Sequence, residues 1–480
     1  MFRAITGRLS VNRRRSASPL TTLRNGSPRM LADFVSQTKN RYLQDVKDGK
    51  GGDWIVAMGN EAGGELPTTP SVCIFPEPRF QDLDSIASAI AYAWFATVVK
   101  KLNTVPLIQT PHPDLGLRAE NLYAFSMSGF KDASSHPKKL DVLCLDDLPK
   151  SSPFPSHKFS LVDHNRLGSY FTKDNPSAVV ISVVDHHEDE QLYKDTANPR
   201  IIAVPTGSCT SLVAGLIHSQ CPTEIALIPE LATLLICGIV IDTNGLKPGG
   251  KAEDSDRQAM AYLLPRSSFV PALPPSILDF DTGTDFNDIP VLKDLTKNLK
   301  TKKEDVSRLD TRDLLRRDYK EDTLTPSWAK ASQIQVGLSS VPIGFKSWIP
   351  QDENFSNTVE GWIKERQIAA LVVLASFSDE KESKKSKKKD EKKSKGEHRR
   401  QLLVVVGDNK DLASKLFREL EENSELQLEE RSFDKFGAEA SGGFREFQAK
   451  MYEQGNVDAT RKIVAPIIRE IVEGSPNENP

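Results

Sequence analysis

The stretch Val183-Val184-Asp185-His186-His187 constrains the fold of this chain more than any other. Two β-branched apolar residues run directly into an acid and two imidazoles, as when a buried strand ends at the carboxyl edge of a parallel sheet. The triplet alone is weak evidence for a metal site, because single histidines are common on surfaces. Its weight comes from three other stretches that present aspartates, namely Asp82-Leu83-Asp84-Ser85, Leu161-Val162-Asp163-His164-Asn165 and Ile239-Val240-Ile241-Asp242-Thr243-Asn244.

Short apolar segments alternate with helical ones from about residue 53 onward, which predicts an α/β protein with a mostly parallel sheet flanked by helices. We expect strands at 54–58, 105–108, 141–145, 159–162, 179–184 and 201–204, and helices at 85–101, 208–219 and 223–235. The apolar run 225–241 reads as a buried helix that feeds a further strand. In the second half, we expect helices at 305–317, 358–366 and 412–421 and strands at 332–341, 369–377 and 402–406.

A chain of 480 residues is too long for one core, so we predict two domains. The boundaries that we predict are an N-terminal tail at 1–50, a first domain at 51–264 that contains the four aspartate-bearing stretches, a Pro- and Asp-rich linker at 265–300 and a smaller α/β domain at 301–478. Residues 378–400 contain Lys, Glu, Asp and Ser but no large apolar residue. We interpret them as a disordered, solvated loop, with polyanion contact as the lesser alternative.

Composition narrows the class of protein. The net charge of −3 argues against a dedicated nucleic-acid binder. Pro229 and Glu230 interrupt the most apolar run, so no membrane segment is expected. Five cysteines without zinc-like spacing are typical of reduced thiols in an intracellular protein. Residues 1–32 hold seven arginines and no acid, which resembles a mitochondrial presequence, or else is a disordered tail before a true start at Met30. We expect a cytoplasmic monomer, with the mitochondrial matrix as the alternative compartment.

Carboxylates and imidazoles gathered at strand ends suit Mg²⁺, Mn²⁺ or Co²⁺. Four aspartates and a histidine exceed the needs of one ion, so a pair of ions roughly 3.5–4 Å apart is the natural use, activating water and neutralising phosphoryl oxygens. No Ser-His-Asp arrangement, Walker loop or Gly-rich dinucleotide loop competes with this interpretation. Gly207-Ser208-Cys209-Thr210 could be a phosphate-facing turn or an ordinary turn and helix cap.

The ordered set Asp-Leu-Asp-Ser, Val-Asp-His-Asn, Asp-His-His, Gly-Ser-Cys-Thr and Ile-Asp-Thr-Asn resembles the DHH phosphoesterase superfamily. It is most similar to exopolyphosphatases, which are related to family II inorganic pyrophosphatases. Asp318-Tyr319-Lys320 resembles the Asp-x-Lys motif of the DHHA2 domain, and Thr460-Arg461-Lys462 resembles its Ser-Arg-Lys motif. The Gly-Gly-Gly-His motif of DHHA1 proteins is absent, which weighs against oligonucleotide or cyclic-dinucleotide phosphodiesterase activity.

The resemblance implies a role for each matching residue. Asp82 would hold the first of two divalent cations and Asp84 the second, with Asp163 bridging both. His186 and Asp242 would complete the second metal, and Asp185 would orient the imidazole. Phosphate oxygens would be bound by His187, Lys320, Arg461 and Lys462. Asp163, Asp242 and His187 are thus the expected catalytic residues.

Two departures from the family pattern matter. Asn60 stands where pyrophosphatases have a metal-binding His, as it does in exopolyphosphatases, which favours polyphosphate as substrate and a weaker first metal that leans to Mg²⁺. The pattern Gly-Asn-x-x-x-Asp-x-Asp-Ser is also interrupted by 18 residues, Gly64 to Gln81. We hypothesise a retained intron, with a genuine surface excursion as the alternative; the sequence of the mature transcript decides between them.

The resemblance therefore implies an exopolyphosphatase that removes terminal phosphate from inorganic polyphosphate. One alternative is an inorganic pyrophosphatase or nucleotide phosphodiesterase of the same superfamily. An alternative of another class is a catalytically inactive interaction protein, for which the insert argues and the intact Asp and His ligands argue against.

Overall fold

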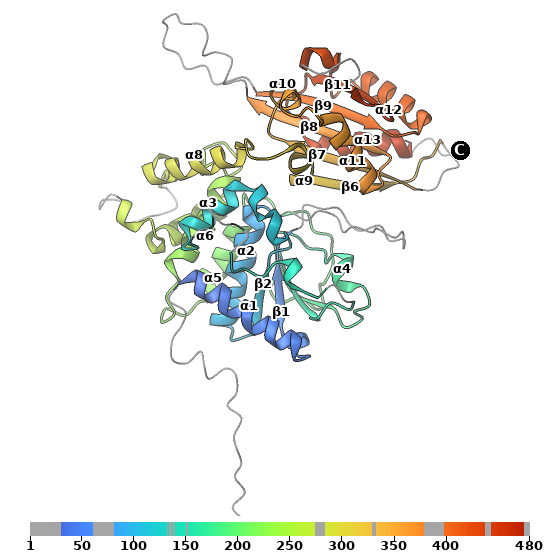
Figure 1. Ribbon diagram of the computed structural model, residues 1–480. Helices are drawn as coiled ribbons and strands as arrows, with labels where there is room; N and C mark the ends of the chain where they lie inside the picture. The colour runs from blue at the N-terminus through green and yellow to red at the C-terminus, as the bar shows by residue number, and fades with distance from the viewer. Residues whose placement is uncertain are drawn as a thin grey trace, which may run out of the picture.

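The computed structural model describes residues 30–60, 81–131, 133, 137, 140–149, 152–273, 284–328, 333–378, 398–436 and 443–474. These residues form two α/β bodies, stacked one above the other in Figure 1. Three of the segments for which predictions were made lie wholly or partly outside the described residues: the Arg-rich segment before Met30, residues 64–80 of the insert, and residues 379–397 of the Lys-rich run. The predictions made for those segments therefore stay predictions.

The first body is built on a five-stranded sheet in which all neighbouring strands are parallel. Its order is β2 (Thr104–Leu107), β1 (Ile55–Met58), β3 (Lys158–Val162), β4 (Val179–Asp185) and β5 (Arg200–Ile202). The strands are short and rich in Val and Ile, and the middle ones are buried because helices and loops cover both faces. The predicted mostly parallel sheet is confirmed.

Helices surround this sheet: α1 (Leu31–Lys47), α2 (Leu83–Trp94), α3 (Ala119–Met127), α4 (Ser169–Thr172), α5 (Cys209–Gln220), α6 (Pro229–Asp242), α7 (Asp254–Leu263) and α8 (Pro290–Glu304). The alanine-rich α2 is buried along its whole length and packs against α5 and α6. Small side chains let these helices approach closely, since a Cβ on Gly238 of α6 would lie 2.7 Å from Thr210 of α5.

Three local predictions are wrong. The strand expected to end at Ile241 is the last part of α6, because burial on all sides outweighs the β-preference of Ile239 and Val240. Within the strand expected at 141–145, only Cys144 is paired, through a single β-bridge to Ile108. The helix expected to begin at Ser85 begins at Leu83, because the side chain of Asp82 caps α2 by accepting from Ser85 N.

Part of the segment predicted as a linker, 265–300, is helical. The side chains of Leu292, Leu295 and Leu299 on α8 are buried in the core of the first body, and α8 packs against α3 and α6. The apolar period of this helix is hidden by the lysines between its leucines. The domain boundaries themselves stay a prediction.

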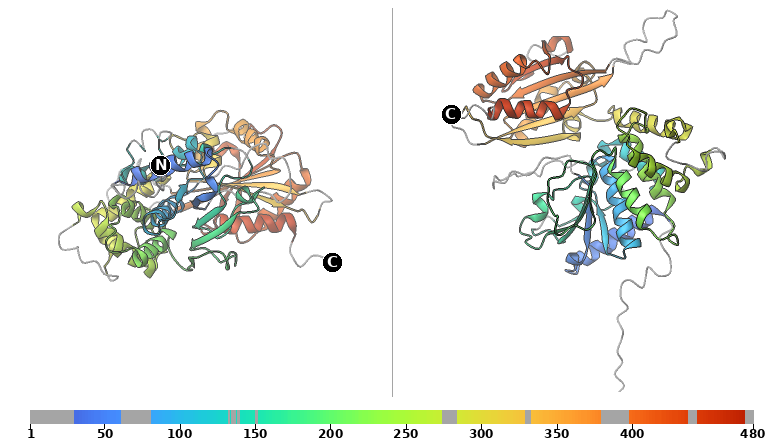
Figure 2. Two further views of the ribbon diagram at one scale, coloured as in Figure 1. Left: turned by 90° about the horizontal axis from the view of Figure 1, so that it is seen from below. Right: turned by 180° about the vertical axis from the view of Figure 1, so that it is seen from behind.

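The second body is a six-stranded mixed sheet with the order β10 (Leu428–Arg431), β11 (Gln448–Gln454), β9 (His398–Val406), β8 (Ala370–Ser378), β7 (Ile334–Val341) and β6 (Tyr319–Leu324). Only β7 and β8 pair in parallel. One face is covered by α9 (Thr311–Arg317), α10 (Phe345–Trp348) and α11 (Phe355–Arg366). The other is covered by α12 (Lys410–Glu422) and α13 (Arg461–Glu473), which lie side by side in Figure 2.

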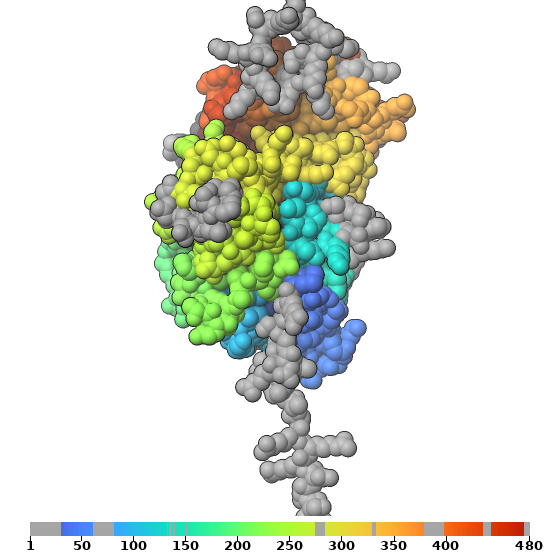
Figure 3. All heavy atoms as spheres, turned by 90° about the vertical axis from the view of Figure 1, so that its left-hand side faces the viewer, coloured from blue at the N-terminus to red at the C-terminus, as the bar shows by residue number. Residues whose placement is uncertain are grey.

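The two bodies touch where α9 meets the segment before α3. Arg316 of α9 pairs with Asp114 at 2.5 Å, and the buried Arg317 donates to the carbonyl oxygen of Leu117 at 3.1 Å. Figure 3 shows the yellow residues of α8 and α9 continuing from the surface of the first body to that of the second. Every helix in the described part of the chain is too short or too polar to traverse a lipid bilayer.

Candidate metal centre

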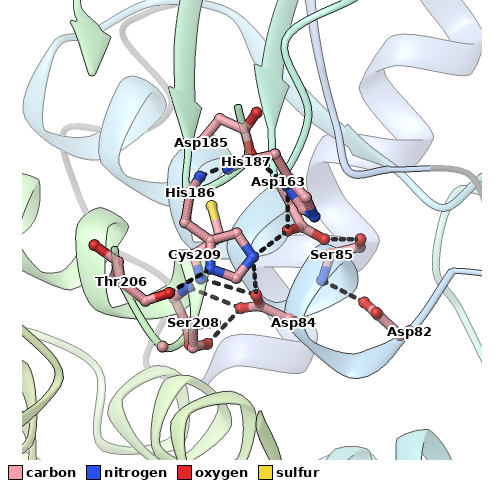
Figure 4. Close-up of polar contacts among 12 residues, drawn as sticks. Asp82, Asp84, Ser85, Asp163, Asp185, His186, His187, Thr206, Ser208 and Cys209 are labelled. Atoms are coloured by element: carbon pink, nitrogen blue, oxygen red, sulfur yellow. Dashed lines mark hydrogen bonds and ion pairs between the residues drawn. The ribbon is translucent and has the colours of Figure 1, made fainter. Parts of the chain in front are cut away.

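Residues that follow β3 and β4 meet at the carboxyl edge of the parallel sheet (Figure 4). Asp163 comes directly after β3, and His186 and His187 come directly after β4. Ligand atoms of these three side chains lie within 4.8 Å of one another, so together they could hold a metal ion. The two imidazole rings are nearly perpendicular, at 86°, with centroids 4.6 Å apart.

The ring of His186 is oriented by a backbone oxygen. Its Nδ1 lies 3.0 Å from the carbonyl oxygen of Thr206, which can only accept a hydrogen bond, so Nδ1 carries the proton. Nε2 then presents a lone pair, 3.1 Å from Oδ1 of Asp163 and 3.7 Å from Oδ2 of Asp84. A lone pair facing two carboxylates is the arrangement of a metal-ligating imidazole with its outer hydrogen bond in place.

Asp84 is held by the N-terminus of α5. Its Oδ1 accepts from Ser208 Oγ at 2.7 Å and Thr210 N at 2.8 Å, and its Oδ2 accepts from Cys209 N at 2.8 Å. These bonds use three of about four carboxylate lone-pair sites and leave Oδ2 facing His186. The N–H groups of Gly207 and Ser208 donate to Asp256. Carboxylates thus occupy this turn, and its interpretation as a phosphate-facing turn is wrong.

Asp163 combines an unusual backbone conformation with a buried side chain. Its φ is +64°, in the left-handed region that few non-glycine residues adopt, and Ser85 Oγ donates to its Oδ2 at 2.5 Å. Its side chain is only 5% exposed. Burial, followed by repulsion from Asp84 and Asp82, raises the pKa of Asp163 well above its usual value. A divalent cation would remove both penalties, which fits the donor set to a metal.

His187 differs from His186 in being half exposed, with 48% of its side chain accessible. Its Nδ1 donates to Oδ1 of Asp185 at 2.8 Å, and this hydrogen bond raises the pKa of His187. Asp185 is fully buried and also accepts from the backbone N–H groups of His186 and His187 and from Nδ2 of Asn165. Burial works to raise the pKa of Asp185, but these hydrogen bonds outweigh it and lower that pKa. Asp185 therefore orients the ring of His187, while Thr206 orients that of His186.

The remaining expected metal ligands lie around this cluster. Asp242 ends α6, and burial together with the charges of Asp84 and Asp82 raises its pKa well above the usual range. Asp82 is exposed and uses one oxygen to cap α2, and Asn60 follows β1 at the same sheet edge. None of these three residues belongs to the group of Asp163, His186 and His187, whose ligand atoms lie within 4.8 Å of one another, so their metal roles stay predictions.

Gln109 links Gln81, the last residue of the insert, to Gly59, which lies before the insert. Gln109 donates from Nε2 to the carbonyl oxygen of Gly59 at 2.8 Å, and its backbone N–H donates to Oε1 of Gln81 at 2.9 Å. Asn121 of α3 donates to the carbonyl oxygen of Gln81 at 3.0 Å. The residue before Asp82 is thereby fixed beside the residue before Asn60, despite the long sequence between them.

The three predicted phosphate-binding cations of the second body lie together. Lys320 of β6 and Arg461 and Lys462 at the start of α13 line one pocket of about 700 Å³. Arg461 pairs with Asp318 at 3.0 Å and also donates to its carbonyl oxygen. Burial and the neighbouring charge of Arg461 lower the pKa of Lys320. Positive charge is thus concentrated at the end of α13 that begins next to β6.

Several supporting residues were not found from the sequence. Thr206 acts through its backbone oxygen, which no side-chain pattern reveals. Ser208 belongs to the Gly-Ser-Cys-Thr motif, but the carboxylate that it binds is 124 residues away. Asn165 stood in the Val-Asp-His-Asn motif and could have been found there, as a polar residue two positions after a strand-end aspartate.

Comparison with known proteins defines the class that this fold and site represent. The family model described as DHH family, N-terminal domain, matches residues 72–239, and that described as DHHA2 domain matches residues 297–471. Between them these matches include Asp82, Asp84, Asp163, the Asp-His-His triplet and the cationic group of the second body. The chain belongs to the DHH–DHHA2 phosphoesterases.

Several individual proteins are similar to this chain. The chain is 27% identical over 302 residues to exopolyphosphatase PRUNE1 of Rattus norvegicus and 25% identical over 300 residues to exopolyphosphatase PRUNE1 of Mus musculus. Each alignment covers 62% of this chain and 58% of the relative, so the match spans less than two thirds of either relative's length. Among solved structures, it is similar to a candidate family II inorganic pyrophosphatase of Methanococcus jannaschii (TM-score 0.46, 18% identity, 87% of this chain and 98% of that one). An exopolyphosphatase-related protein from Bacteroides fragilis gives a TM-score of 0.34 at 12% identity, covering 90% and 96% of the two chains.

Proposed function

We propose that this chain is an exopolyphosphatase, which hydrolyses the terminal phosphate of inorganic polyphosphate. The observation that carries the proposal is the pairing of two features: acids and imidazoles at the edge of the parallel sheet, and a cationic pocket lined by Lys320, Arg461 and Lys462. A polyanion needs both, since one feature suits divalent cations and the other suits phosphate oxygens. The PRUNE1 relatives, which are named exopolyphosphatases, support the same substrate.

Two divalent cations, Mg²⁺ or Mn²⁺, are the cofactors that the donor set fits. Asp163 would be shared, with Asp84, His186 and Asp242 on one side and Asp82 and Asn60 on the other. When bound, such ions lower the pKa of a coordinated water and offset charge on phosphoryl oxygens. The hydrogen bond that His186 donates to the carbonyl oxygen of Thr206 fixes its ring for this use, and the N-terminus of α5 fixes Asp84.

The remaining site residues would bind and orient the substrate. His187 is held by Asp185, and the elevated pKa keeps its ring protonated to higher pH than usual, so the exposed imidazolium would donate to a phosphoryl oxygen. Lys320, Arg461 and Lys462 would bind the phosphates of the chain that do not react. Their charge would also stabilise the additional negative charge that develops in the transition state.

The test is phosphate release by the purified full-length chain. We expect release from tripolyphosphate and longer polyphosphates with added Mg²⁺ or Mn²⁺, and loss of release in excess EDTA that is restored by either metal. Pyrophosphate and a cyclic nucleotide, assayed in parallel, separate the two enzymatic alternatives. Faster turnover of either one than of polyphosphate would replace the proposed substrate, and no turnover of any of them with bound metal would leave the inactive interaction protein.

A further inference from the structure

Arg118 is a buried cation whose hydrogen-bonding capacity is largely unused. It stands at the N-cap position of α3, and only 11% of its side chain is exposed. Among the described residues its Nε has no hydrogen-bond partner, and its Nη1 makes one long bond, of 3.4 Å, to Oε1 of Glu120. A guanidinium offers five N–H donors, and a buried donor without a partner costs free energy.

Glu120 does not fully neutralise the charge of Arg118, because the same carboxylate also pairs with Arg317 of the second body. Nη2 of Arg317 lies 3.4 and 3.5 Å from the two oxygens of Glu120. Arg317 has further acceptors in the carbonyl oxygens of Leu117 and Lys303, at 3.1 and 2.8 Å. Two guanidinium groups thus share one carboxylate, and of the two it is Arg118 that has spare donors.

The backbone around Arg118 is fixed between the two halves of the site. On one side, Asn121 of the same helical turn donates to the carbonyl oxygen of Gln81, the residue before Asp82. On the other side, Leu117 accepts from Arg317, the residue before Asp318, whose side chain holds Arg461. Figure 1 shows α3 at the end of the first body that is nearest to α9 and β6.

The direction of the pKa shift of Arg118 agrees with a position between the two halves of the site. Burial alone would lower the pKa of Arg118, but the negative charges of Glu120, Asp318 and Asp82 outweigh burial and raise it. Asp318 pairs with Arg461, which lines the cationic pocket, and Asp82 is one of the expected metal ligands. Arg118 is therefore close enough to both groups to feel their charges.

We propose that Arg118 is a substrate-binding residue of the first body, which donates to a phosphate group of the polyanion between the metal centre and Arg461. The inference rests on the proposed function and deepens it. A phosphate oxygen would satisfy the idle guanidinium donors and balance the second positive charge around Glu120. Neither Arg118 nor its Leu-Arg context belongs to the motifs from which the site was first predicted.

The experiment compares Arg118→Gln, Arg118→Lys and, as a matched control, Arg266→Gln. Arg266 is exposed and contacts Tyr262, so its replacement removes the same charge away from the site. Binding of inorganic tripolyphosphate to EDTA-treated protein is measured by calorimetry, and KM and kcat are measured with metal. We expect Arg118→Gln to weaken binding about 10- to 100-fold and to raise KM more than it lowers kcat. Arg118→Lys should lose less, because the charge remains and the planar fork does not.

A purely structural role for Arg118 would lower the unfolding temperature without changing the tripolyphosphate affinity of the folded protein, and that result would overturn the inference. If Arg118→Gln does not fold, Arg118→Lys decides: affinity equal to that of the unaltered protein overturns it. Turnover of polyphosphate with unchanged KM in Arg118→Gln would leave the proposed function standing and remove this residue from it. Absence of both binding and turnover in the unaltered protein would remove both proposals.

Discussion

The Nε2 atom of His186 lies 3.1 Å from Oδ1 of Asp163, while the other nitrogen of the same ring is committed to the carbonyl oxygen of Thr206. The ring therefore has no proton to give Asp163 unless it becomes a cation. Two lone-pair groups at this distance repel each other in a buried site, and Asp84 adds a further carboxylate. A divalent cation shared by the three side chains would turn the repulsion into attraction.

We therefore expect Asp163→Asn to abolish metal binding at this position. Replacing one oxygen by an amide group removes the negative charge, while the side-chain volume stays the same. Loss of outer partners alone costs metal sites 10- to 100-fold, so loss of a ligand should reduce Mn²⁺ affinity by more than about 100-fold. Titration calorimetry measures this directly. The folded protein should be at least as stable to urea without metal, because a buried carboxylate with a raised pKa has been removed.

Asp48→Asn is the control for that prediction. Asp48 follows α1 at the surface and accepts only from Gln44 among the described side chains, so its replacement should leave Mn²⁺ affinity unchanged. Equal Mn²⁺ affinity in Asp163→Asn and the unaltered protein would show that the cluster is not the metal centre.

Much of the first body could be predicted from the sequence, because its strands are set by residues that are neighbours along the chain. The strands before Asp163 and His186 are short Val- and Ile-rich runs bounded by polar residues, and both were expected within one or two residues of their observed bounds. Parallel pairing then brings their ends to one edge. Asp242 is also close enough to Asp84 and Asp82 for their charges to raise its pKa. It ends a helix, however, rather than the strand that its β-branched neighbours suggested.

The partners of the site residues could not be predicted, because they depend on long-range packing. Nothing near Asp84 indicates that the N-terminus of α5 will bind it, and nothing near Arg118 indicates that Arg317 will share its carboxylate. Strand β6 and helix α13 were also missed as elements. Lys320 and Arg461 were found through a resemblance to family motifs rather than through local periodicity.

The alkaline limit of substrate affinity should be set in part by Lys320. Burial and Arg461 lower its pKa, Lys462 acts in the same direction, and Asp318 and Asp322 oppose them. A lowered lysine pKa means that the charged form is lost at a lower pH than the usual value near 10.4. Affinity for tripolyphosphate should therefore fall as pH rises through that lowered pKa, and KM measured from pH 7 to 10 would reveal the decline.

Lys320→Arg is the control for this pH dependence, since a guanidinium stays protonated across the whole range. The fall in affinity should move to higher pH in this variant, even if its affinity at pH 7 is somewhat changed. If KM rises over the same alkaline pH range in Lys320→Arg and in the unaltered protein, Lys320 does not bind the substrate in its charged form.

The close approach of β1 to α2 predicts that Gly59→Ala will damage the site more than the fold. A Cβ at Gly59 would lie 2.5 Å from the carbonyl oxygen of Ser85, and backbone cannot rotate away as a side chain can. Relief requires α2 to move outward at its start, at a cost of about 1–3 kcal/mol in the free energy of unfolding. That end of α2 carries Asp82 and Asp84, and a displacement of about 1 Å at a reacting centre costs roughly 100-fold in rate.

Gly361→Ala is the matched comparison, because it lies in α11 with no atom within 4 Å of the added Cβ. It should stabilise the protein by up to about 1 kcal/mol through helix propensity and leave phosphate release unchanged. Urea unfolding and polyphosphate turnover of both variants test this, and full activity in Gly59→Ala would show that the spacing of β1 and α2 does not control the position of the two aspartates.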